Sequence, residues 1–121
     1  MKKRILVVDD DPRLLEITRE LLELEGYVVR TQVSPFGTSR AAIEFAPDLI
    51  LLDVNMPGLS GDRLAAILLG DQGDEQRRVL LYSSNDEDSL RNAAARVGTA
   101  GYVCKGDAFT LRRRVREQLA G

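Results

Sequence analysis

Hydrophobic positions along the chain fall into short continuous runs, separated by longer segments with helical spacing. A short run that is apolar throughout predicts a strand buried on both faces, as in a parallel sheet. A more polar run at residues 27–33 predicts a further strand at a sheet edge. The apolar runs lie at residues 5–8, 49–52, 79–82 and 101–104.

The longer segments predict helices. Asp11 is a suitable N-cap for the first, and Pro12 suits its first position because the N–H that proline lacks would be unpaired there. Gly26 predicts the end of this helix, and Asp107 is the expected N-cap of the last. The other helices are expected near residues 38–45, 61–69, 87–97 and 108–119. The apolar face of the first helix is expected to comprise Leu14, Leu15, Ile17, Leu21, Leu22 and Leu24.

Five strands and five helices in strict alternation predict an α/β fold, a doubly wound parallel sheet with right-handed crossovers and helices on both faces. In such sheets, ligands bind beyond the carboxyl ends of the strands, near the switch in strand order. The side chains expected at these ends are those of Asp9, Asp10, Asp11, Asp53, Ser83, Ser84 and Lys105.

Several carboxylates at one sheet edge repel one another, so they favour a cation between them. Oxygen ligands of this kind suit Mg²⁺, which also binds phosphate oxygens. Lysine offers a mobile positive charge, serine a hydroxyl donor, and aspartate a nucleophile that can form an aspartyl phosphate. The strand ends therefore predict a site for a metal ion and a phosphoryl group.

Composition excludes several classes of protein. The 121 residues fit one domain, residues 1–121, and the net charge of -2 argues against direct nucleic-acid binding. The absence of histidine excludes His-dependent triads and His-ligated zinc sites. A single cysteine, Cys104, cannot form an internal disulfide, and no run approaches the roughly 20 apolar residues of a membrane span. We therefore expect a cytoplasmic protein.

Four motifs lie at the strand ends: VVDDDP at 7–12, LLDVNMPG at 51–58, LYSS at 81–84 and GYVCK at 101–105. Together they resemble the motifs of the receiver domains of bacterial two-component response regulators. Each motif is common alone, and the resemblance rests on their order and on their shared position, over essentially the whole chain. It implies a flavodoxin-like (βα)5 fold with strand order 2-1-3-4-5.

The resemblance also implies a role for each residue at the strand ends. Asp53 is implied to be the phosphoacceptor, with Lys105 paired to the phosphoryl oxygens. Asp10 and Asp53 would bind Mg²⁺, or Mn²⁺, through their carboxylates, Asn55 through its backbone carbonyl, and Asp9 through a water molecule. The expected activity is limited to the domain's own phosphorylation and dephosphorylation.

Signalling is implied to follow phosphorylation. Ser83 would hydrogen-bond the phosphoryl group, Tyr102 would follow that hydroxyl inward, and Asn55 and Asn85 would tune the lifetime of the phosphate. The surface of the fourth helix, fifth strand and fifth helix would then change. The implied partners are a sensor histidine kinase or histidine phosphotransfer protein, a downstream output protein or domain, and a second copy bound through that surface, but no nucleic acid and no membrane.

The sequence departs from the family after the last strand. The family has proline after the lysine, joined by a cis peptide, whereas this chain has Gly106. Because a cis bond before a residue other than proline costs about 2.5 to 4 kcal/mol, a trans peptide is expected between Lys105 and Gly106. Ser83 also stands where threonine is commoner, and Ser84 replaces a small apolar residue.

Two other functions stay open. A receiver-like module could bind partners without being phosphorylated, and a haloacid-dehalogenase-like phosphatase could use Asp9 in the pair formed with Asp11. The simpler interpretation of Asp11 is a helix cap, and Cys104 is expected to be a small buried hydrophobe. A solvated helix face is the simpler interpretation of Arg112, Arg113, Arg114 and Arg116.

Overall fold

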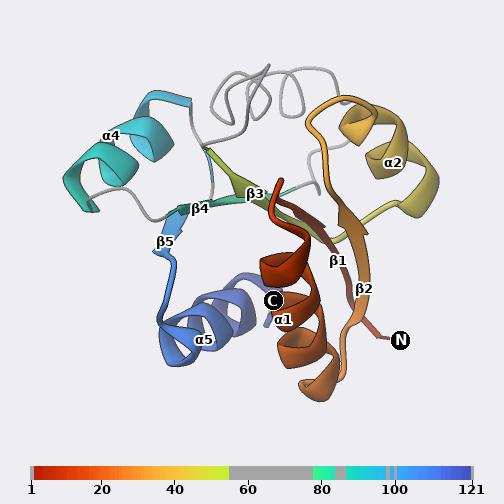
Figure 1. The fold of residues 1–121 in the computed structure, drawn as a ribbon. Helices are drawn as coiled ribbons and strands as arrows, with labels where there is room; N and C mark the ends of the chain where they lie inside the picture. The colour runs from red at the N-terminus through yellow and green to blue at the C-terminus, as the bar shows by residue number, and fades with distance from the viewer. Residues whose placement is uncertain (1, 55–77, 84–86, 98, 100, 121) are drawn as a thin grey trace.

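A five-stranded parallel sheet lies between two layers of helices (Figure 1). The computed structural model describes residues 2–54, 78–83, 87–97, 99 and 101–120. The strands are β1 (Arg4–Val8), β2 (Val28–Gln32), β3 (Leu49–Asp53), β4 (Val79–Ser83) and β5 (Gly101–Cys104), in the order β2-β1-β3-β4-β5. The helices are α1 (Pro12–Leu24), α2 (Thr38–Phe45), α4 (Glu87–Val97) and α5 (Ala108–Leu119). The doubly wound fold and the strand order are thus confirmed, and the helix expected at 61–69 lies outside the described residues.

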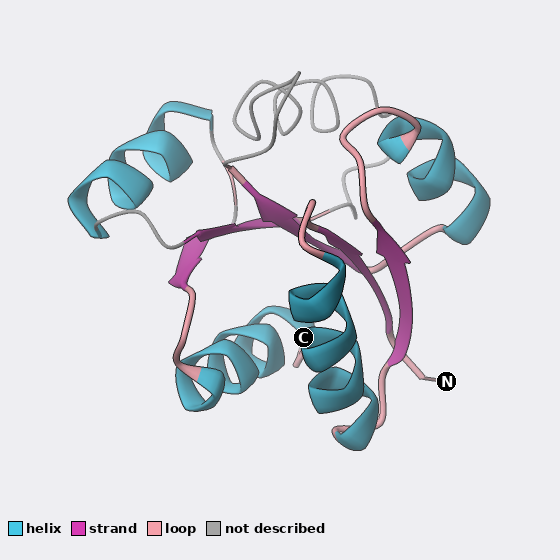
Figure 2. Cartoon of the chain, viewed as in Figure 1, coloured by secondary structure: helices cyan, strands magenta, loops and turns pink. Residues whose placement is uncertain are grey.

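Side chains alternate between the two faces of the sheet, and each face has its own core. On one face Ile5 and Val7 pack with residues of α1 and α5, and on the other Leu6 and Val8 pack with residues of α2 and α4. Figure 2 shows these two helix pairs on opposite sides of the strands. The edge position of the more polar strand β2 agrees with the expectation from its sequence.

The predicted caps fix where α1 and α5 begin. Asp11 Oδ1 accepts hydrogen bonds from the backbone N–H groups of Arg13 and Leu14, and Pro12 opens the helix. Asp107 Oδ1 accepts from Thr110 N at 3.0 Å. Because both caps directly follow strand ends, they hold the first turns of α1 and α5 beside the carboxyl edge of the sheet.

The apolar face predicted for α1 is wrong at two positions. Ile17 is 61% exposed and Leu24 is 85% exposed, whereas Leu15 and Leu22 are buried. Each exposed residue lies two positions after a buried one, which is roughly 200° around the helix. The buried face includes Thr18 instead, whose hydroxyl lies 3.2 Å from that of Tyr82 on β4.

Candidate functional site

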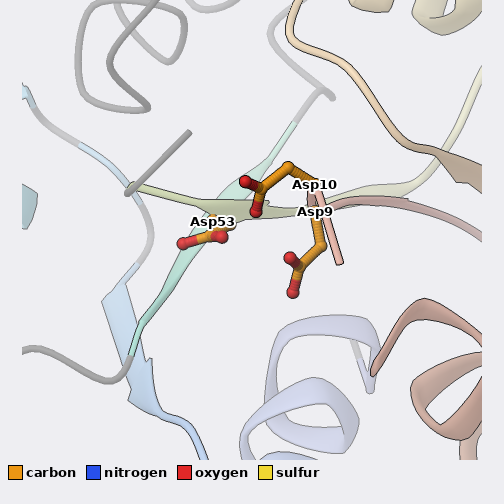
Figure 3. Close-up of side chains that lie close together, drawn as sticks. All are labelled: Asp9, Asp10 and Asp53. Atoms are coloured by element: carbon orange, nitrogen blue, oxygen red, sulfur yellow. The ribbon is translucent and has the colours of Figure 1, made fainter. Parts of the chain in front are cut away.

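Two strands meet where the strand order switches, and three aspartates lie at their carboxyl ends. The pairing of Val8 with Leu52 places Asp9 and Asp10, which follow β1, next to Asp53 at the end of β3. One carboxylate oxygen from each of the three lies within 4.8 Å of the others. Figure 3 shows that Asp9 and Asp10 leave the end of β1 in different directions. This is the crevice in which doubly wound folds bind ligands.

The three carboxylates differ in burial. Asp9 is 1% exposed and Asp53 is 2% exposed, whereas Asp10 is open to solvent. Asp9 Oδ1 accepts a hydrogen bond from Asp11 N at 3.0 Å, and Asp9 N donates to Gln32 O at 3.1 Å. The Asp11 carboxylate caps α1 and is not part of the cluster, as expected.

Lys105 reaches the cluster from the end of β5. Its Nζ lies 3.0 Å from Asp9 Oδ2 and 3.2 Å from Asp53 Oδ2, and its backbone N–H donates to Ser83 O at 2.8 Å. Burial disfavours the charged form of Lys105, but the carboxylates of Asp9 and Asp53 outweigh it and raise the pKa of the ammonium above its ordinary value. Lys105 is therefore held as a cation beside both buried carboxylates.

The charges of this cluster fit a divalent cation. Three carboxylates against one ammonium give the cluster a formal charge of -2. The donors are all oxygens, two of them nearly inaccessible and one facing solvent, which suits an ion that keeps several of its waters. Asp9, Asp10 and Asp53 are thus the described residues that could hold Mg²⁺. Asn55 lies outside the described residues.

Ser83 and Tyr102 lie on the other face of the sheet. Ser83 is fully buried at the end of β4, paired with Cys104 of β5. The half-buried Tyr102 donates its hydroxyl to Glu87 Oε1 at 3.0 Å and accepts a longer hydrogen bond from Arg91 Nε at 3.4 Å. Tyr102 therefore links β5 to α4, whereas Asn85 and Ser84 lie outside the described residues.

The arginines of α5 only partly form the expected solvated face. Arg113 is exposed, but the half-buried Arg114 places its guanidinium 5.9 Å from the centre of the Tyr102 ring. Arg116 forms an ion pair with Glu25 at 2.9 Å. Cys104 is also less buried than expected, because β5 is an edge strand.

One aromatic residue at the site has no counterpart among the sequence predictions. The ring centre of Tyr82, on β4, lies 5.0 Å from Lys105 Nζ, and its hydroxyl lies 3.2 Å from Thr18 Oγ1. The position of Tyr82 in the strand could have predicted which face of the sheet its side chain occupies. Tyr82 precedes Ser83, so its side chain points to the opposite face, and it pairs in register with Asp53.

The chain turns sharply after Lys105. Gly106 has a φ of 95°, a conformation that residues with a Cβ rarely adopt. All peptide bonds among residues that the structure describes are trans, including the one between Lys105 and Gly106, as predicted.

Comparison with known proteins identifies a family that covers most of the chain. The family model of the response regulator receiver domain matches residues 5–116. The transcriptional regulatory protein KdpE of Mycobacterium tuberculosis is 35% identical over 101 residues, which are 84% of this chain and 43% of that protein. The chain thus spans less than half the length of this curated relative.

Solved structures agree in fold. A BeF3-activated N-terminal receiver domain of RstA from Klebsiella pneumoniae is 25% identical, with a TM-score of 0.88 over 98% of this chain and 100% of that one. A response regulator of Chloroflexus aurantiacus is 25% identical, with a TM-score of 0.91 over the whole of both chains. Within the described part of the chain, no helix is both long and apolar enough to cross a membrane.

Proposed function

The chain belongs to the response regulator receiver domain family, and from this premise we propose that Asp53 accepts a phosphoryl group from a phosphohistidine of a partner protein. The observation that carries the proposal is the placement of Asp53. Its buried carboxylate lies 3.2 Å from the Lys105 ammonium, within a cluster whose charge suits a divalent cation.

The reaction is an in-line displacement at phosphorus. A carboxylate oxygen of Asp53 forms the new O–P bond, the P–N bond to the donor imidazole breaks, and its electron pair remains on the imidazole nitrogen. Lys105 is placed to pair with the phosphoryl oxygens. Little other covalent chemistry is needed, because positioning and charge neutralisation supply most of the catalysis of phosphoryl transfer.

A divalent cation completes the charge balance of the site. The carboxylates of Asp10 and Asp53 and the backbone carbonyl of Asn55 would hold Mg²⁺ or Mn²⁺, with Asp9 bound through a water molecule. A bound cation neutralises charge on the transferring phosphoryl group. The domain would catalyse only its own phosphorylation and dephosphorylation, with Asn55 and Asn85 setting the lifetime of the phosphate.

Phosphorylation would switch the surface formed by α4, β5 and α5. The new phosphoryl group offers Ser83 and Lys105 contacts that are absent before transfer, and only such differential contacts shift a conformational equilibrium. Tyr102 would move with Ser83 and give up its hydrogen bonds to α4. The partners would be a sensor histidine kinase or phosphotransfer protein on the donor side, and an output protein or domain, or a second copy, on the receiving side.

Incubation with Mg²⁺ and acetyl phosphate or phosphoramidate tests the proposal by intact-protein mass spectrometry. We expect one added phosphoryl group in the wild type, none in Asp53→Asn, and none when EDTA removes the metal ion. Asp48→Asn is the matched control because Asp48 precedes the opposite end of β3, where an amide oxygen can still accept from Arg4 N. It should label like the wild type.

The same experiment decides against the proposal in two ways. Label that persists in Asp53→Asn and is lost in Asp9→Asn would indicate the dehalogenase-like chemistry. No label with any donor would indicate a module that binds partners without phosphorylation.

A further inference from the structure

We propose that Tyr82 is a positioning residue that holds the Lys105 ammonium against the carboxylates of Asp9 and Asp53. This rests on the proposed function only in that Lys105 is taken to act on the phosphoryl group. The arrangement itself is visible in the protein before any transfer.

The first argument is the shared face of the sheet. Tyr82 pairs in register with Asp53, so both side chains point to the side covered by α1 and α5. Asp9 continues the alternation of Ile5 and Val7 on that side. Tyr82 is 4% exposed, and its ring centre lies 5.0 Å from Lys105 Nζ, within the range of a cation–π attraction. The ammonium is thus bounded by the ring and by two carboxylate oxygens.

The second argument is that little restrains the lysine apart from its two ion pairs. Its backbone is fixed by the hydrogen bond to Ser83 O, but Gly106 follows at once with a φ of 95°. A lysine side chain has a flexible four-carbon stem and loses much rotamer freedom when its ammonium is held in one place. The residue after Lys105 is not a proline, which would stiffen the turn. The Tyr82 ring therefore restricts the ammonium end of the lysine side chain instead.

The third argument is that Tyr82 is itself restrained. A cavity of about 180 Å³ adjoins its ring, lined by apolar residues of α1 and α5 together with Thr18. The hydroxyl of Tyr82 lies 3.2 Å from Thr18 Oγ1. Burial raises the pKa of the Tyr82 phenol, so the ring stays neutral at physiological pH. The Thr18 contact therefore keeps the neutral ring next to the ammonium, although the adjoining cavity leaves the ring space to move away.

The test compares variants that remove the ring, the hydroxyl or only the packing. Tyr82→Leu removes the ring, Tyr82→Phe keeps it, and Thr18→Val removes the partner of the hydroxyl. Leu111→Ala is the matched control, since it enlarges the same cavity and leaves the ring in place. Two readouts are used: the rate of phosphorylation by acetyl phosphate at saturating Mg²⁺, and the ¹³C relaxation of Lys105 Cε in the unphosphorylated protein.

Tyr82→Leu should slow phosphorylation by about threefold to tenfold, the range set by a partly desolvated cation–π contact, and should increase the mobility of Lys105 Cε. Leu111→Ala should stay within about twofold of the wild type on both readouts. Tyr82→Phe and Thr18→Val both keep the ring and remove its hydroxyl contact, so both should lie between Leu111→Ala and Tyr82→Leu. The Mg²⁺ affinity should change little, because the carboxylates are untouched. In a Lys105→Ala background, Tyr82→Leu should have no further effect on the rate.

Three results would overturn the inference. Equal effects of Tyr82→Leu and Leu111→Ala would mean that packing alone matters, and a Tyr82→Phe variant as slow as Tyr82→Leu would mean that the ring is not the cause. Additive losses with Lys105→Ala would mean that Tyr82 acts elsewhere. If Tyr82→Leu does not fold, Thr18→Val and Tyr82→Phe still separate the outcomes. If the wild type takes no phosphoryl group, the proposed function fails, while the relaxation of Lys105 Cε still decides the role of Tyr82.

Discussion

The charge imbalance at the carboxyl edge predicts that two substitutions change stability in opposite directions. Without a divalent cation, Lys105→Met should destabilise the protein and Asp53→Asn should stabilise it. Lys105 is the partner of two buried carboxylates, at 3.0 Å and 3.2 Å, so its removal takes away a positive charge that lies against both of them. Asp53→Asn removes one of three mutually repelling charges and leaves Lys105 paired with Asp9.

The magnitudes follow from the distances. Removing one partner of a buried ion pair costs about 3 to 5 kcal/mol, and the solvent-facing Asp10 places this site near the lower value. The carboxylate oxygens lie within 4.8 Å of one another, and two like charges at this upper limit repel by about 3.5 kcal/mol at an effective dielectric constant of about 20. Asp53→Asn relieves two such repulsions, about 7 kcal/mol together, and loses one attraction of about 5 kcal/mol at 3.2 Å, so a net gain of about 2 kcal/mol is expected.

Urea unfolding followed by circular dichroism, in EDTA and at saturating Mg²⁺, measures both effects. Mg²⁺ should stabilise the wild type and Lys105→Met, because it binds only the folded cluster, and should stabilise Asp53→Asn least. Lys3→Met, at an exposed lysine, is the control for the new apolar side chain. The reasoning is refuted if Lys105→Met is as stable as the wild type in EDTA, or if Asp53→Asn is the less stable of the two variants.

Three further predictions concern pH, backbone strain and switching. The pKa values of Lys105 and Tyr82 are both raised, from 10.5 and 10.0. Their contribution to stability is therefore complete below pH 10 and is lost as pH rises through the folded-state pKa values. Urea unfolding between neutral and strongly alkaline pH should show a decline in the free energy of unfolding that is smaller in Lys105→Met. Gly106→Ala should lower the free energy of unfolding by about 1 kcal/mol. No atom lies near the added Cβ, so only the φ of 95° disfavours alanine at this position. An unchanged urea midpoint would contradict this prediction. Ser83→Ala should leave phosphorylation largely intact but reduce the NMR shift changes of α4, β5 and α5, and equal changes in both proteins would exclude a switching role for Ser83.

The fold could be predicted from the sequence because local and global signals agree. The strands buried on both faces are apolar throughout, and capping aspartates mark the helices that follow β1 and β5. Residues such as Asp9, Asp53 and Lys105 could be identified before any geometry, because parallel strands bring their carboxyl ends to one edge. Their arrangement depends on the fold class and on little else.

Other features depend on the angle at which elements pack, which the sequence pattern does not contain. The sequence spacing predicts Ile17 and Leu24 on the apolar face of α1. The rotation of α1 on the sheet instead turns these two residues outward and Thr18 inward. The sequence predicts Tyr82 only as a residue of a buried strand. Its relation to Lys105 arises only because β4 and β5 are neighbours and because the lysine folds back over the ring.

The most direct test of the central claim is to identify the phosphorylated residue chemically. Borohydride reduction of the protein after treatment with Mg²⁺ and acetyl phosphate converts an aspartyl phosphate to homoserine, which peptide mass spectrometry locates. We predict homoserine at position 53 only, dependent on both the donor and the metal ion, and absent in Asp53→Asn. Homoserine at position 9 or 10, or at no position under conditions that label a control receiver domain, would contradict the account.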